Sequence, residues 1–399
     1  MVEHRITILP GDGTGREVVL EAQRVLDAIS NNSNIGFEQE VIPCGGQHFL
    51  ETGKVWTEGS YEFCRDESDA LILGAIGWPG AKLENGDLAG GEVILGLRAG
   101  LELYANVRPI KLYEGVLHKV HDKFAQHWQP ELVDMVVLRE NTEGLYHSLL
   151  HRSALKVNGK SDYEPPQLDF PGLEGEVAWD PRPISQNGSE RLIRAGFEIA
   201  SQRSGNSDGK SSVHCVDKSN VTRGCQLFRK VFKEVSSSYP KINAEFAFID
   251  AFTMWLIRNP EWFDVVVTSN MFGDIATDLG SVLQGGMGMA SSANIGDKHG
   301  MFEPVHGSSP KHAGQNKVNP IATILSVQQM LGWLGNKNND QELLNASVVI
   351  DQAVAEHLKY GKELTYDLGG TASTSQVGTS IAQRISDILS EQQLNSLYT

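Results

Sequence analysis

Apolar residues recur along the chain at spacings typical of strands and helices. An apolar run at Arg5–Leu9, the turn PGDGTG and helically spaced apolar residues at Arg16–Ile29 predict a strand, a glycine turn and a helix. Further apolar runs predict strands at Ala70–Leu73, Val133–Leu138, Ser212–Val216, Ala244–Ile249 and Val265–Thr268. Helical patterns cover Glu190–Ser201, Cys225–Val235, Ile321–Trp333 and Leu343–Tyr360. Strands that alternate with helices predict an α/β architecture with parallel pairing.

One segment interrupts this alternation. Residues 151–189 contain five prolines, several glycines and few aliphatic side chains, which predicts an irregular arm rather than part of the core. The 399 residues of the chain predict two or three domains, or one large α/β unit with a second lobe, at about 150 residues per domain.

Composition and charge narrow the class of protein. A net charge of −16 disfavours binding to nucleic acid, although a local cluster of arginines can still bind a small anion. The chain has no apolar run of the roughly 18 residues that cross a membrane, and its start lacks a signal-peptide pattern. The four cysteines form no CxxC pair, which favours buried thiols in a reducing compartment. We therefore expect a cytoplasmic protein.

The glycine turn at residues 11–15 invites a dinucleotide-binding interpretation. The Rossmann fingerprint requires a third glycine where this chain has Arg16, so the fingerprint fails. A tight turn between strand and helix explains these glycines.

Two groups of charged residues suggest a site for an anion and a metal. Arg98, Arg108 and Arg139 suit a dicarboxylate or tricarboxylate, because arginine binds carboxylates through a planar fork; each alone is more often a surface ion-pair partner. Asp274 and Asp278 share one face of a helix, where a divalent cation such as Mg²⁺ or Mn²⁺ would offset their repulsion. The alternative is two solvated aspartates.

Two further positions could carry chemistry. Lys218 follows an apolar strand, although most lysines are solvated surface groups. Residues 302–320 form a glycine- and proline-rich loop without a strand-forming core, and its basic side chains could bind a nucleotide.

The motifs of the chain, taken together and in order, resemble those of the β-decarboxylating dehydrogenases. These motifs are LPGDGTG, LYANVRP, RENTEGLY, VDKSNV, VVVTSNMFGDIATDLGS and FEPVHGSSPKHAGQNKVNP, and the resemblance runs from about residue 5 to residue 380. The family includes isocitrate, 3-isopropylmalate, homoisocitrate and tartrate/malate dehydrogenases.

The resemblance implies a two-lobed, non-Rossmann α/β fold. Residues 1–103 and 285–399 would form the large, cofactor-side domain, and residues 104–284 the small, dimerisation domain with the arm at 151–189. It also implies a homodimer whose two active sites share residues, and a hydroxy-dicarboxylate or tricarboxylate substrate.

The resemblance also assigns roles to individual residues. Arg98, Arg108 and Arg139 would hold substrate carboxylates, and Asn220 would lie near the nicotinamide and substrate. Asp274 and Asp278 would bind the metal together with Asp250 of the second subunit. Lys218, also from the second subunit, would act with Asp250 as the base, and Tyr146 would protonate the enolate. The residues implied to bind the cofactor are Glu303, His306, Gly307, Ser308, Lys311, His312, Val318, Asn319 and Tyr366.

Departures from the family patterns bear on the substrate. Where isocitrate enzymes usually carry serine and asparagine, this chain has Glu92 and Ile94, and Ile94 with Leu95 resembles the aliphatic pair of isopropylmalate enzymes. RENTEGLY instead resembles the isocitrate and tartrate branches. A 3-isopropylmalate-like substrate is favoured, with isocitrate, tartrate, D-malate or another substituted malate as alternatives.

The cofactor and the class of protein follow from the same comparison. Lys311, His312 and Tyr366 resemble the NADP pattern, which favours NADP over NAD, although Gly370 stands where some NADP enzymes carry arginine. A non-catalytic regulatory subunit is the alternative of another class. Retention of the tyrosine, the lysine and the three aspartates argues against it.

Overall fold

The computed structural model describes the chain except for residues 1, 85, 148–171, 173–174, 176 and 398–399. Most of the predicted arm therefore lies outside the described residues. Its end is described, and there the prediction is wrong: helix α6 (Gln186–Gln202) begins within it, after Ser185, whose side chain accepts a hydrogen bond from the Gly188 backbone N–H. An N-terminal cap of this kind is a common start of a helix.

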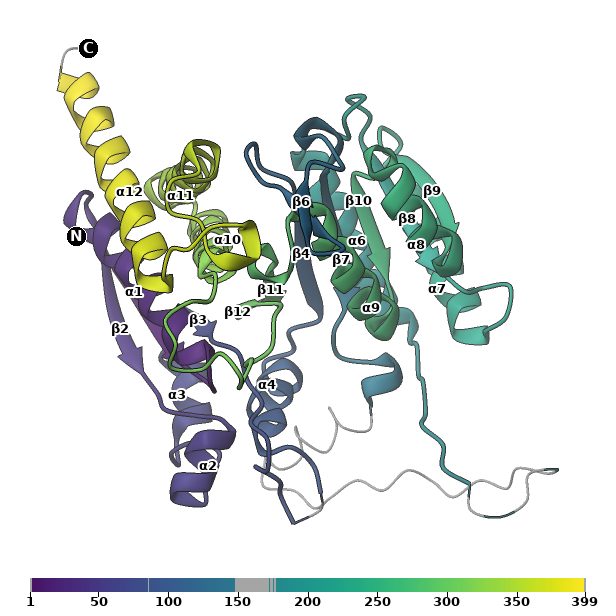
Figure 1. Cartoon of the computed structure of the whole chain (residues 1–399). Coiled ribbons are helices and arrows are strands. Elements are labelled where there is room, and N and C mark those ends of the chain that lie inside the picture. Colours follow the sequence, from purple (N-terminus) through teal and green to yellow (C-terminus); the bar gives the residue numbers. More distant parts are fainter. Residues whose placement is uncertain (1, 85, 148–171, 173–174, 176, 398–399) are drawn as a thin grey trace.

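A ten-stranded sheet runs through the molecule (Figure 1). Its strands, in spatial order, are β2 (Ile35–Val41), β1 (Val2–Leu9), β3 (Ala70–Leu73), β12 (Gly300–Pro304), β11 (Ser291–Ile295), β4 (Ala105–Lys111), β7 (Asp134–Glu140), β10 (Val265–Thr268), β8 (Ser212–Asp217) and β9 (Asn243–Phe248). A separate hairpin pairs β5 (His118–Val120) with β6 (Lys123–Ala125).

The strand order supports the predicted division into two domains, which stays a prediction. The first five strands of the sheet come from residues 1–103 and 285–399, and the other five come from residues 104–284. The two groups meet where β11 pairs with β4.

Helices pack against both halves of this sheet. Beside the first group of strands lie α1 (Gly15–Asn31), α10 (Ile321–Asn338), α11 (Gln341–Tyr360) and α12 (Thr374–Leu397). Beside the second group lie α6, α7 (Arg223–Ser236), α8 (Ile249–Arg258) and α9 (Asn270–Ser281). Three more helices, α2 (Gly46–Thr52), α3 (Ser60–Asp66) and α4 (Ala89–Gly100), belong to the N-terminal part.

Alternation along β10 explains why both faces of the sheet are covered. Val265 and Val267 pack with α6 and α7, whereas Val266 packs with Phe252 and Leu256 of α8. Because successive side chains of a strand point to opposite faces, a run of apolar residues requires a helix on each side.

Three predictions about the strands need correction. Pairing is not parallel throughout, since β4 is antiparallel to β7 and β11, and β11 is antiparallel to β12. Ile249 belongs to α8 rather than to the preceding strand. Phe302 lies in β12, so the loop predicted from residue 302 begins after Pro304.

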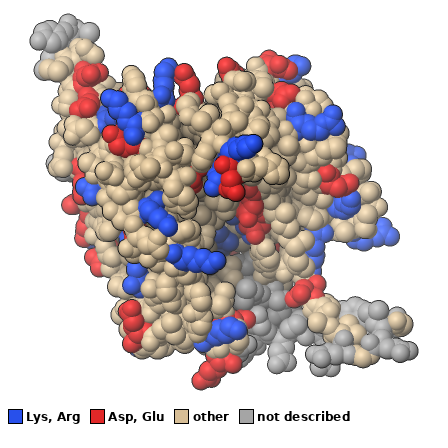
Figure 2. Space-filling model, viewed as in Figure 1, with Lys and Arg blue, Asp and Glu red and all other residues tan. Residues whose placement is uncertain are grey.

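Surface charge and the apolar character of the helices relate to the expectations about nucleic-acid binding and location. On the face seen in Figure 2, acidic and basic side chains are interspersed. Within the described part of the chain, no helix has both the length and the apolar character that a membrane span requires. The cytoplasmic location and the absence of a nucleic-acid partner stay predictions. All four cysteines are buried and free, as expected.

Candidate active site

The structure brings the three predicted arginines together at the centre of the sheet. Arg98 comes from the last turn of α4, Arg108 from β4 and Arg139 from β7, and all three are buried. The neighbouring charges of Arg108 and Arg98 help to lower the pKa of Arg139, which shows that the guanidinium groups share one site. Sequence spacing alone could not show this, because it depends on β4 pairing with β7.

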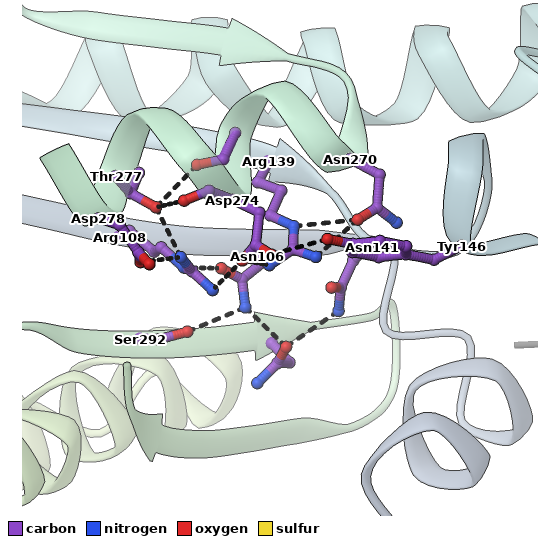
Figure 3. Close-up of polar contacts among 12 residues, drawn as sticks. Asn106, Arg108, Arg139, Asn141, Tyr146, Asn270, Asp274, Thr277, Asp278 and Ser292 are labelled. Carbon is purple, nitrogen blue, oxygen red and sulfur yellow. Dashed lines mark hydrogen bonds and ion pairs between the residues drawn. The ribbon is translucent and has the colours of Figure 1, made fainter. Parts of the chain in front are cut away.

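Asp274 of α9 is the main partner of two of these arginines (Figure 3). Its Oδ1 accepts hydrogen bonds from Arg139 Nη1 and, at 3.3 Å, from Arg108 Nη2, while its Oδ2 accepts one from the Tyr146 hydroxyl at 3.0 Å. Asp278 lies one turn further along α9, with its Oδ1 4.0 Å from Arg108 Nη1. Two of the predicted metal ligands, two of the substrate arginines and the predicted catalytic tyrosine are therefore neighbours.

Local sequence explains how α9 approaches β7 so closely. A Cβ atom at Gly273 would lie 2.6 Å from the Arg139 Cβ, so only glycine lets the helix pack here. At the start of the helix, Asn270 Oδ1 accepts hydrogen bonds from Arg139 Nε at 3.1 Å and Nη2 at 2.6 Å. Asn270 was not singled out in the sequence.

Burial and charge set the protonation of this cluster. Burial, followed by the charges of Arg108 and Arg98, lowers the pKa of Arg139 to about 9. Burial acts to raise the pKa of Asp274, but the guanidinium groups of Arg139 and Arg108 outweigh it and lower that pKa. Asp278 differs, because burial and the charge of Asp274 raise its pKa. Asp274 is thus stabilised as an anion, whereas Asp278 is repelled by it.

The third arginine has a different partner. Arg98 Nη2 donates to Glu303 Oε1 at 2.7 Å in a buried ion pair, and its buried Nε has no hydrogen-bond partner among the residues that the structure describes. An unpaired buried N–H is a favourable place for a ligand oxygen.

Lys218 and Asp250 form a pair of their own. Lys218, at the end of β8, donates from Nζ to Asp250 Oδ1 at the start of α8, and this hydrogen bond lowers the pKa of Asp250. In the part of the chain described by the structure, no hydrogen bond or ion pair joins either residue to Asp274 or Asp278. Asn220, two residues after Lys218, is exposed.

A cavity of about 440 Å³ lies beside the predicted cofactor loop. Five of the predicted cofactor residues line it, namely His306, Gly307, Val318, Asn319 and Tyr366, together with Thr14, Gly286, Met287, Gly288, Ser309 and Asp367. Glu303, Ser308, Lys311 and His312 are not among its lining residues. Polar backbone and small side chains around a cavity of this size suit part of a dinucleotide.

Comparisons with known proteins agree with this geometry. The family model described as isocitrate/isopropylmalate dehydrogenase matches residues 5–381. The chain belongs to that family. It is 38% identical to a 3-isopropylmalate dehydrogenase from Thermobifida fusca, over 96% of this chain and 98% of that protein. It is 37% identical to a 3-isopropylmalate/3-methylmalate dehydrogenase from Methanocaldococcus jannaschii, over 96% and 99%.

A solved structure supports the fold of the family. The isocitrate dehydrogenase from Methylococcus capsulatus aligns with a TM-score of 0.77 at 30% identity, covering 96% of this chain and 99% of that one. The predicted family and the isocitrate/isopropylmalate dehydrogenase-like α/β fold are thereby confirmed. The family uses NAD or NADP and a divalent metal.

The cofactor loop of this family member is fixed by residues that sequence reasoning missed. Thr14 donates from its backbone N–H at 2.9 Å and from its hydroxyl at 3.0 Å to the Ser308 carbonyl oxygen. The Glu17 carboxylate accepts hydrogen bonds from the backbone N–H groups of Gly314 and Asn316. The glycine turn at residues 11–15, which lacks a Rossmann fingerprint, therefore holds the predicted cofactor loop through Thr14.

Basic and aromatic side chains gather at the far end of this loop. The rings of His312 and Tyr366 lie 5.7 Å apart, and Lys317 Nζ lies 5.7 Å from the centre of the Tyr366 ring. Lys311 is exposed on the same loop. Gly370 cannot take the arginine of some NADP enzymes, because a Cβ there would lie 1.9 Å from the Leu364 carbonyl oxygen.

Proposed function

We propose that this enzyme oxidises and decarboxylates a malate derivative with an apolar substituent, of the 3-isopropylmalate type. The observation that carries the substrate proposal is the position of Ile94 and Leu95. Both lie about one helical turn before Arg98 on α4, so their side chains neighbour that arginine, and Ile94 packs against the apolar cluster under the helix. An aliphatic surface beside a carboxylate-binding arginine suits an alkyl group and disfavours a third carboxylate.

The three arginines would bind the two carboxylates of the hydroxy acid. In the structure, Arg108 and Arg139 form ion pairs with Asp274, and Arg98 forms one with Glu303. The protein's own carboxylates therefore balance the charges of the three arginines. Substrate carboxylates would take over part of these contacts and reach the unpaired Nε of Arg98.

Asp274 and Asp278 fit a divalent cation as two oxygen ligands on one helix face. The described part of one chain contains no group of three or more histidine, cysteine or acidic residues that could hold a metal. We propose that Asp250 of a second subunit supplies the third carboxylate, in keeping with the 65% exposure of its side chain. Homodimerisation and the choice between Mg²⁺ and Mn²⁺ belong to this proposal.

Proton transfers would then fall to two side chains, Lys218 and Tyr146. A divalent metal held here would supply polarisation of the substrate hydroxyl, and a nicotinamide would supply the hydride acceptor. Lys218, hydrogen-bonded to Asp250, would take the hydroxyl proton. Tyr146 would give its proton to the carbon that loses carbon dioxide. Burial and the charge of Asp274 raise the pKa of Tyr146, so its hydroxyl is protonated and available.

We propose NADP as the preferred cofactor, with its adenosine half in the 440 Å³ cavity. Lys311, His312, Lys317 and Tyr366 would bind the 2′-phosphate, because Tyr366 lines the cavity and His312 and Lys317 lie beside its ring, where cations and hydrogen-bond donors favour an added phosphate.

A substrate panel tests these proposals. Turnover of 3-isopropylmalate, isocitrate, homoisocitrate, tartrate and D-malate would be followed by reduced-nicotinamide absorbance, with NAD or NADP and with Mg²⁺ or Mn²⁺. We expect the highest kcat/KM with 3-isopropylmalate and NADP. Ile94→Asn should lower that value by about tenfold or more, whereas the control Leu20→Asn, on an exposed position of α1, should not. Preference for isocitrate would overturn the substrate proposal, and no turnover at all would favour a regulatory subunit.

A further inference from the structure

Asn294 stands at one end of a polar row that crosses three strands. In the ladders, Arg139 of β7 lies opposite Asn106 of β4, and Asn106 lies opposite Asn294 of β11. Directly opposed residues project from the same face of a sheet, so the side chains of Arg139, Asn106 and Asn294 lie in one line across the three strands. Arg108 and Ser292, each two residues along its strand, project from the same face.

The side-chain amide of Asn294 is saturated with hydrogen bonds. Its Oδ1 accepts from Asn106 Nδ2 at 2.7 Å and from Asn141 Nδ2 at 2.9 Å. Its Nδ2 donates to the Met301 carbonyl oxygen at 3.1 Å and to Glu303 Oε1 at 2.9 Å. Two accepted and two donated bonds are the full capacity of an asparagine amide, and Asn294 is completely buried. Figure 3 shows the converging amides of Asn106 and Asn141.

Through these bonds Asn294 connects two arginines that come from different parts of the chain. Glu303 Oε1, which accepts from Asn294, also accepts from Arg98 Nη2. Asn106, which donates to Asn294, accepts from Arg108 Nε at 2.6 Å through its Oδ1. Each arginine is therefore two hydrogen bonds away from the same amide. The connection spans the β11–β4 junction, where the two predicted domains meet.

We propose that Asn294 is a positioning residue that sets the separation of Arg98 and Arg108 and so matches the site to the spacing of two substrate carboxylates. This inference rests on the proposed function, which makes those arginines substrate ligands. An amide is required at this position, because only a side chain with both donors and acceptors can hold Asn106 on one side and Glu303 on the other. A carboxylate of the same shape would repel Glu303 while still accepting from Asn106.

Binding of dicarboxylates of increasing length tests the inference. Dissociation constants of malonate, succinate and glutarate would be measured calorimetrically with Mn²⁺ present, along with that of NADP. In the wild type we expect one length to bind at least several-fold better than the others. Asn294→Asp should weaken the preferred length by about tenfold and flatten the preference, while NADP affinity stays within about twofold. Asn345→Asp, an equivalent change at an exposed helical amide bonded to Gln392, should alter none of these values.

A second change should restore the preference. In Asn294→Asp combined with Glu303→Gln, an amide at position 303 can donate to the new carboxylate and still accept from Arg98. We expect part of the lost affinity and selectivity to return. If Asn294→Asp does not fold, as judged by its melting temperature, Asn294→Ser serves in its place, since serine keeps polarity but cannot reach both Asn106 and Glu303.

The outcomes separate this inference from the proposed function. If Arg98→Lys leaves all three dicarboxylates unaffected, the substrate role of Arg98 fails, and the inference fails with it. If Arg98→Lys weakens binding but the Asn294 variant keeps the wild-type length preference, the inference alone is overturned. Equal binding of the three lengths by the wild type, or an equal loss of NADP and dicarboxylate affinity in the variant, also overturns it.

Discussion

Asp274 and Asp278 share one helix face, yet neutralising them should change stability in opposite directions. Asp274 is 33% exposed and accepts hydrogen bonds from two buried arginines and a tyrosine, whereas Asp278 is 59% exposed and lies near the negative charge of Asp274. In the absence of metal, Asp274→Asn leaves the arginines without their counter-charge. Asp278→Asn removes only a repelled carboxylate.

The contacts set the size of the two effects. Removing one member of a buried ion pair costs about 3–5 kcal/mol, and the one-third exposure of Asp274 reduces this to about 2 kcal/mol. For Asp278→Asn we expect a change between zero and a gain of about 0.5 kcal/mol, since surface ion pairs and repulsions are worth little.

Thermal or denaturant unfolding in a chelator, at neutral pH, measures both effects. Mn²⁺ added above its dissociation constant should then stabilise the wild type by an amount that grows with the logarithm of the Mn²⁺ concentration. Neither variant should be stabilised to the same extent, because each has lost a ligand. Because the pKa of Asp274 is lowered in the folded protein, the carboxylate contributes fully to the free energy of unfolding above about pH 4. That contribution is lost as the pH falls through the folded pKa. An Asp274→Asn protein as stable as the wild type in chelator, beside a destabilised Asp278→Asn protein, would refute this reasoning.

Three further predictions concern the cofactor loop and the shared site. Lys311→Asp should shift the ratio of NAD to NADP dissociation constants by more than about tenfold towards NAD, and the exposed control Lys230→Asp should not; a ratio within about twofold of wild type contradicts the assignment. Homodimers of Lys218→Ala and of Tyr146→Phe should both be nearly inactive, but mixed dimers should regain activity, because one of their sites has both residues intact. If demonstrated heterodimers regain no activity, the two subunits do not share residues in one active site. Glu17→Ala should weaken NADP binding several-fold by releasing two backbone N–H groups of the cofactor loop, while Glu17→Gln should retain part of the affinity; equal affinity in both variants and the wild type disproves the anchoring role.

Strands with apolar residues on both faces were readable from the sequence, and two strands that carry polar residues of the candidate site, β4 and β11, were not. The bounds of β3 and β10 agree with the predictions, because all four residues of each are buried and the apolar run is continuous. β4 and β11 were missed, since Asn106, Arg108, Ser292 and Asn294 place polar groups where a buried strand normally has aliphatic ones. The polar side chains that hide these strands include Arg108 of the candidate active site and the asparagines bonded around it.

Two kinds of error have simple physical causes. The apolar run at the end of β9 continues into α8 without a turn, so hydrophobicity alone could not place the boundary at Ile249. The direction of pairing is also invisible to local pattern, because β4 is amphipathic whichever way its neighbours run. The convergence of the arginines depends on that pairing and therefore appears only in three dimensions.

Charge balance explains how a chain with a net charge of −16 can bind an anionic substrate. In the free enzyme, three buried or nearly buried guanidinium groups face the carboxylates of Asp274, Asp278 and Glu303, so the site is close to neutral. A dicarboxylate entering alone would compete with Asp274 and Glu303 for the arginines, and a divalent cation entering alone would meet those same arginines. Entering together, they would add no net charge, because Asp274 would serve as a ligand of the cation and leave the guanidinium groups of Arg108 and Arg139 to the substrate. Each ligand would therefore remove an obstacle to the other, and by linkage the tightening would be equal in both directions. The overall acidity of the surface has little influence on this exchange, because the exchange takes place among buried groups at short range.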